Sequence, residues 1–98
     1  MNKELDKAVL RKAIDTYGDY AQIDVAIEEM AELQKALLKM RRAKVETIPC
    51  AFDAIVDEIA DVYVMMRQLV MIYDCKNQVK NRIKYKVDRL RRRMDGAE

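Results

Sequence analysis

The chain reads Ala-Ile-Glu-Glu-Met-Ala-Glu-Leu over residues 26–33 and Ile-Val-Asp-Glu-Ile-Ala-Asp-Val over residues 55–62. The two stretches match in kind at every position, aliphatic with aliphatic, acid with acid and alanine with alanine. In both, apolar side chains recur at spacings of three and four residues, which is the period of an amphipathic helix. This repeat predicts two equivalent helices, each with an apolar stripe and an acidic border.

The rest of the chain favours the same all-α class. Its 98 residues include two glycines and one proline, and we find no sustained apolar and polar alternation that would predict a strand. Helices are predicted at about 2–17, 19–44 and 76–94. Another, with Thr47 as N-cap and Pro49 in its first turn, is predicted to reach about residue 73. Short connections predict antiparallel neighbours in one domain, residues 1–98, with its core at about 19–94.

Acidic residues border the apolar stripes of both predicted helices. On a helical wheel, Glu29 borders the apolar stripe of its helix and Glu58 is flanked by apolar side chains. Glu32 and Asp61 follow these two residues by three positions, so each pair projects from one side of its helix. Carboxylates are seldom buried unless they are paired or bind a metal ion. If the two helices pack antiparallel, four carboxylates meet, and divalent cations would relieve their repulsion.

A solvated acidic face is the alternative explanation, because acid pairs three residues apart are common on helix surfaces. On such a face, a lysine or arginine usually follows four residues later. Here Glu28 is followed by Glu32 and Asp57 by Asp61, so both neighbours carry like charge. The chain thus has two matched clusters of like charge, each at the border of an apolar stripe. Such clusters favour a metal site over a solvated acidic face.

The absence of histidine restricts the chemistry further. It excludes a nucleophile activated by histidine, a histidine-liganded zinc ion and the Glu-x-x-His di-iron motif. Any metal ion must then be held by oxygen atoms. Such ligands predict Mg²⁺, with Mn²⁺ as the other candidate.

Charge is distributed unevenly along the chain. Residues 1–74 carry 10 basic and 14 acidic side chains, whereas residues 75–98 carry nine basic and three acidic ones. The last helix is therefore basic, and its cations could contact phosphate oxygens. It also suits a non-catalytic module that binds nucleic acid or protein, which is the alternative function. The acidic repeat, which would repel a nucleic acid, argues against nucleic acid as a partner.

Location and assembly are predicted from the apolar residues. No apolar run reaches the about 18 residues that a membrane span needs, and the charged N-terminus has no apolar signal segment. We therefore expect a cytoplasmic protein with no membrane partner.

Apolar side chains extend beyond the main stripe of the third helix, so a homodimer or a homotetramer is expected, with the acidic site beside an interface.

The acidic residues also follow a known spacing. Glu28-Glu29-Met30-Ala31-Glu32, a gap of 25 residues, and Glu58-Ile59-Ala60-Asp61 resemble the signature of the MazG-like nucleotide pyrophosphohydrolases. These belong to the all-α NTP pyrophosphatases, which include the dimeric dUTPases. The resemblance covers about residues 20–92, including Lys-Tyr-Lys-Val-Asp-Arg-Leu at 84–90. It implies an antiparallel four-helix protomer that completes a helical bundle by oligomerisation.

The resemblance implies an activity and roles for individual residues. The family cleaves a nucleoside triphosphate between its α- and β-phosphates with Mg²⁺, giving a monophosphate and pyrophosphate. The implied metal ligands are Glu29, Glu32, Glu58 and Asp61, and the auxiliary acid that orients a ligand or the attacking water is Glu28. Substrate contacts are expected from the basic last helix and from one residue ahead of the acids. They are Lys84, Lys86 and Arg89 for phosphate, and Gln22 for sugar or base.

Overall fold

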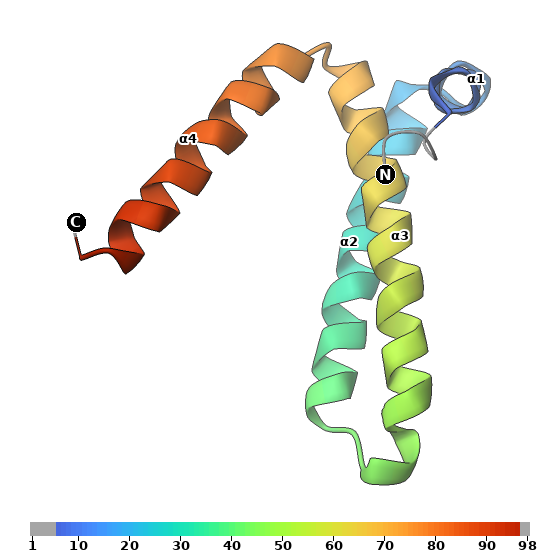
Figure 1. The fold of residues 1–98 in the computed structure, drawn as a ribbon. Coiled ribbons are helices and arrows are strands. Elements are labelled where there is room, and N and C mark those ends of the chain that lie inside the picture. Colours follow the sequence, from blue (N-terminus) through green and yellow to red (C-terminus); the bar gives the residue numbers. More distant parts are fainter. Residues whose placement is uncertain (1–5, 97–98) are drawn as a thin grey trace.

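Four α-helices and one short 3₁₀ helix form the chain in the computed structural model, which describes residues 6–96 (Figure 1). The α-helices are α1 (Lys7–Tyr17), α2 (Asp19–Arg41), α3 (Ile48–Ile72) and α4 (Lys76–Met94), and the 3₁₀ helix η2 (Val45–Thr47) joins α2 to α3. Residues 6–96 contain no strand, so the all-α class with four helices is confirmed. None of these helices has the long apolar stretch that crossing a membrane requires.

Local chemistry accounts for the bounds of α1. The Asp6 carboxylate caps it by accepting hydrogen bonds from the backbone N–H groups of Ala8 and Val9, at 2.9 and 3.3 Å. Gly18, with a φ of 94°, separates α1 from α2 in a conformation that favours glycine. This break lets α1 run across the end of α2 (Figure 1). The predicted start of this helix, residue 2, lies outside the described residues.

The turn between α2 and α3 begins earlier than predicted. α2 ends at Arg41 instead of residue 44, because Arg42 has left helical geometry with φ −101° and ψ 1°. The Thr47 hydroxyl then closes η2, since it accepts a hydrogen bond from the Lys44 N–H and donates one to the Lys44 carbonyl, both at 3.0 Å. Thr47 precedes α3 as predicted, but its side chain stabilises the turn and makes no capping hydrogen bond to the helix.

An antiparallel hairpin of α2 and α3 is the centre of the fold (Figure 1). Ala26 and Ala36 on α2 are buried, and such small side chains let two helices approach closely. Met65 is buried on α3, and α1 adds Leu10 and Ile14 at one end of the hairpin. The hairpin therefore fixes the two copies of the acidic repeat relative to each other.

The last helix does not lie along the hairpin. After α3, Asp74 adopts a left-handed conformation with φ 49°, and the Cys75 N–H bonds to the Val70 carbonyl at 3.2 Å. This hydrogen-bonded turn is of the Schellman type and ends α3 in a defined direction. α4 then diverges from α2 and α3, as Figure 1 shows. The antiparallel arrangement predicted for neighbouring helices thus holds for α2 and α3, and α4 departs from it.

Candidate metal centre

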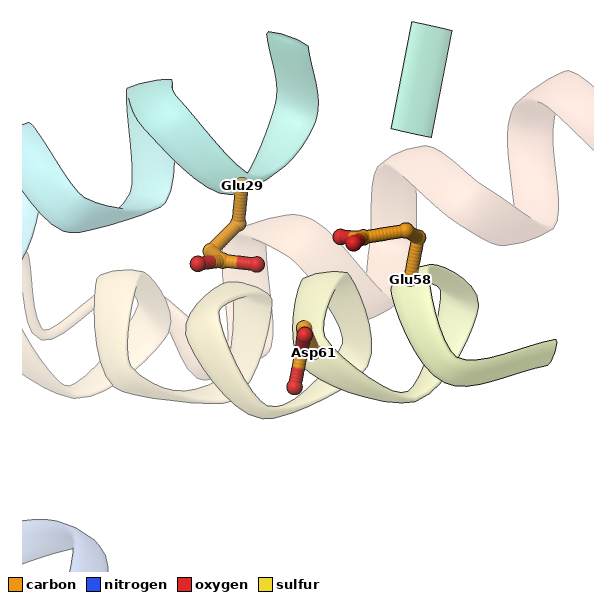
Figure 2. A group of neighbouring side chains, drawn as sticks. All are labelled: Glu29, Glu58 and Asp61. Atoms are coloured by element: carbon orange, nitrogen blue, oxygen red, sulfur yellow. The ribbon is translucent and has the colours of Figure 1, made fainter. Parts of the chain in front are cut away.

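Three carboxylates from two helices meet near the middle of the hairpin. Glu29 comes from α2, and Glu58 and Asp61 come from α3 (Figure 2). One oxygen of each carboxylate lies within 4.8 Å of an oxygen of both others. The antiparallel pairing produces this arrangement because it places the middle of α3 opposite the middle of α2. We call Glu29, Glu58 and Asp61 the acidic group.

The acidic group is electrostatically unfavourable by itself. Glu29 and Glu58 are half-buried, and the Oε2 atom of Glu58 is buried without a hydrogen-bond partner. An unpaired buried oxygen costs stability. Burial raises the pKa of the Glu29 carboxyl above its usual value of 4.5, and the neighbouring Asp61 and Glu58 carboxylates raise it further. A divalent cation would both satisfy the oxygen and relieve the repulsion.

The donor set of the acidic group fits a hard divalent cation. Its three carboxylates supply oxygen ligands, and Mg²⁺ completes six-fold coordination with water or phosphate oxygens. Two ligand atoms about 2.1 Å from a common ion stand at most about 4.2 Å apart. The three oxygens of the acidic group lie within 4.8 Å of one another, which is close to this span. The acidic group could hold a metal ion, as the sequence predicts.

Two further acids of the predicted site lie outside the acidic group. Glu28 and Glu32 are on α2 and both are exposed. On the helical wheel, Glu32 lies one step further round α2 than Glu29, away from α3. The roles implied for these residues, auxiliary acid for Glu28 and further ligand for Glu32, stay predictions.

Gln22 is part of a buried polar pair. Its side chain is 7% exposed, and its Nε2 atom donates a hydrogen bond of 2.6 Å to Oε1 of Gln68, which is 4% exposed. The pair joins α2 to α3, so Gln22 has a clear structural role, and its contact with sugar or base stays a prediction. Gln68 was missed because glutamine is rarely a core residue. Its spacing of three residues from Met65 is the signal that would have found it.

The residues expected to contact phosphate lie on α4. Lys84 and Lys86 are exposed, and Arg89 is half-buried. α4, which carries them, diverges from the hairpin that holds the acidic group (Figure 1). A second copy of the chain or a movement of α4 could bring them to a phosphate at the acidic group.

The chain was compared with known proteins. No protein-family model, curated protein or solved structure matches it. These comparisons therefore assign neither the four-helix fold nor the acidic group to a family. The MazG-like resemblance rests on the spacing of the acidic residues alone and stays a prediction.

Replacing Glu29 with glutamine is expected to stabilise the metal-free protein increasingly as pH rises. The pKa of Glu29 is raised in the folded state. Below the unfolded-state pKa, both the folded and the unfolded state hold the Glu29 proton. As pH rises, the unfolded state releases this proton first, because its Glu29 pKa is the lower one. The stability that this proton contributes is therefore lost as pH rises through the folded-state pKa. Urea unfolding in EDTA between about pH 4 and about pH 7 measures the difference between the variant and the wild type.

Glu28→Gln is the matched control for this experiment, because it removes an exposed charge from the adjacent position. We expect its stability difference from the wild type to change much less with pH. If the Glu29→Gln variant and the wild type show the same pH dependence, the acidic group is not repulsive in the absence of metal.

Proposed function

We propose that this protein is a Mg²⁺-dependent nucleoside triphosphate pyrophosphohydrolase. It would cleave the bond between the α- and β-phosphates and release a nucleoside monophosphate and pyrophosphate. The observation that carries the proposal is the acidic group, in which both helices supply carboxylates and Glu58 has a buried unpaired oxygen. The resemblance of the acid spacing to MazG-like enzymes supplies the reaction type. House-cleaning or nucleotide-pool control in the cytoplasm is the role that suits this activity.

The residues of the chain have separate roles in this proposal. Glu29, Glu58 and Asp61 hold the metal ion, with Glu32 as a further ligand. Bound Mg²⁺, or Mn²⁺ in its place, lowers the pKa of coordinated water and neutralises phosphate charge. Glu28 orients the attacking water or accepts its proton. The proposed nucleotide contacts are Gln22 with sugar or base, and Lys84, Lys86 and Arg89 with phosphate.

Assembly into a homodimer or homotetramer is part of the proposal. The chain exposes 8024 Å², against about 5,800 Å² for a compact monomer of its mass. Its radius of gyration is 16.7 Å, where about 13 Å is typical. The excess surface is larger than the about 800 Å² that each partner buries in a standard interface.

An apolar stripe on α3 is the surface that we assign to the second copy. Five of its side chains are 42% to 58% exposed and recur at helical spacing: Phe52, Val56, Ile59, Tyr63 and Met66. Burying them against another copy would supply the core that the single chain lacks. A molar mass of 11.5 kDa in light scattering would contradict this assembly.

A binding module without catalysis is the second candidate function. The observation in its favour is the exposure of α4, a helix rich in lysine and arginine that diverges from the rest of the chain (Figure 1). Such a helix could follow a phosphate backbone, and its binding would weaken as salt increases. This function would leave the unpaired oxygen of Glu58 unexplained.

A nucleotide panel tests the proposed function. Purified protein with Mg²⁺ or Mn²⁺ is expected to release pyrophosphate and the matching monophosphate from at least one canonical or damaged nucleoside triphosphate. Release of both products distinguishes cleavage at the α–β bond from stepwise removal of phosphate. The same reaction in EDTA should yield neither product. A full panel without pyrophosphate would exclude the enzyme, and salt-dependent binding to duplex DNA without turnover would favour the binding module.

A further inference from the structure

A small cavity with a basic lining lies at one end of the hairpin. Residues of α1, of the C-terminal end of α3 and of the start of α4 line a volume of about 180 Å³ there. Four cations from these three helices line the cavity: Lys7, Arg11, Arg67 and Lys76. Asp74 adds one carboxylate, and Leu10 and Val70 add apolar surface. The lining therefore has a net positive charge.

The surrounding chain does little to neutralise these cations. Arg11 forms an exposed ion pair with Asp15 at 3.8 Å. Within residues 6–96, no carboxylate lies within ion-pair distance of Lys7, Arg67 or Lys76. The Lys7 ammonium lowers the pKa of Lys76, and burial and the Arg67 guanidinium lower it further. The positive groups are thus close enough to repel one another.

Two of these lysines occupy unfavourable positions on their helices. Lys7 and Lys76 are the first residues of α1 and α4, where the positive end of the helix dipole disfavours a cation. The Asp6 carboxylate caps α1, whereas α4 has no acid in its first turn and Cys75 provides it with no side-chain cap. An anion in the cavity would offset the unfavourable position of Lys76, since it could accept hydrogen bonds from the first N–H groups of α4.

We propose that this cavity binds a phosphate-class oxyanion. Its volume of about 180 Å³ is below the about 300–1,000 Å³ of sites that enclose a whole organic ligand, so a small polyanion fits better than a nucleoside. The guanidinium groups of Arg11 and Arg67 match pairs of phosphate oxygens, and the two lysines add point charges.

The cavity is separate from the acidic group. Arg67 follows Asp61 on α3 by six residues, which is about 9 Å along the helix axis. The proposal therefore stands whether or not the protein hydrolyses nucleotides. The bound oxyanion could be free pyrophosphate or phosphate, or the phosphate tail of a nucleotide, because these share the same chemistry.

Calorimetric titration with inorganic pyrophosphate in EDTA tests the proposal. Without a divalent metal ion the acidic group repels pyrophosphate, so binding reports on basic side chains. Variants of the cavity then distinguish it from the basic residues of α4. We expect saturable binding by the wild type. Lys76→Gln should weaken the affinity by about tenfold or more, because a charge-assisted hydrogen bond is lost. Lys7→Gln should act in the same direction, and it provides the test if the Lys76 variant does not fold.

Lys12→Gln is the matched control. It removes the same charge from α1, but Lys12 is exposed on a side of the helix turned away from Lys7. Its affinity for pyrophosphate should stay within about twofold of the wild type. Absence of binding by the wild type, or equal weakening by Lys12→Gln, would overturn the proposal.

A second titration identifies the source of the oxyanion. If a nucleoside triphosphate in EDTA competes with pyrophosphate, the cavity takes the phosphate tail of a nucleotide. If it does not compete, the cavity is selective for the free anion. Both results support an oxyanion site and assign it to one source.

Discussion

Replacing Glu58 with glutamine is expected to lower the rate of nucleotide turnover by about a thousandfold or more. Glu58 is the member of the acidic group whose Oε2 atom is buried without a hydrogen-bond partner. An amide has one neutral oxygen, so it cannot balance the charge of a divalent cation as a carboxylate does. Pyrophosphate release at saturating Mg²⁺ and nucleotide measures the effect.

The same variant separates metal binding from structural support. A ligand that binds the folded state raises its stability, so Mg²⁺ should raise the melting temperature of the wild type and leave Glu58→Gln nearly unchanged. Glu46→Gln is the matched control because Glu46 is an exposed acid in η2, and it should keep both turnover and the Mg²⁺ effect. Turnover by Glu58→Gln close to that of the wild type would exclude Glu58 as a metal ligand. If Glu58→Gln is unfolded in EDTA, Glu58 has a structural role.

The helical class and the central hairpin are predictable from local sequence, whereas the direction of α4 is not. Sparse glycine and proline and the helical spacing of apolar residues predict the helices. The path of α4 depends on the left-handed conformation of Asp74, which aspartate adopts in some contexts and not in others. The end of α2 is not predicted by composition either. Residues 42–44 favour a helix by composition, and the hydrogen bonds between Thr47 and Lys44 form a turn instead.

The acidic group shows which part of a site a helical wheel can predict. The wheel places Glu29 and Glu58 beside the apolar stripes, and the structure brings both together with Asp61. Spacing by three residues places Glu32 on the same side of α2 as Glu29, but it does not determine contact with α3. That contact depends on how each helix is rotated in the hairpin, which is set by packing of Ala26, Met65 and their neighbours.

Replacing Gln68 with leucine is expected to lower the free energy of unfolding by about 1–3 kcal/mol. The Gln68 side chain accepts the 2.6 Å hydrogen bond from Nε2 of Gln22, and both side chains are buried. Leucine cannot accept this hydrogen bond, so the Gln22 amide would be left buried without its partner. Urea unfolding in EDTA measures the loss without a contribution from metal binding.

The double variant Gln22→Leu with Gln68→Leu is the decisive control, because it replaces both partners with apolar side chains. It should recover most of the lost stability, since no unpaired amide remains in the core. A double variant as unstable as Gln68→Leu would contradict the pair as the source of the effect. The double variant also separates the two roles of Gln22. If Gln22 is purely structural, restored stability should return the KM for nucleotide to the wild-type value. If Gln22 also contacts sugar or base, the KM should stay raised although the fold has recovered.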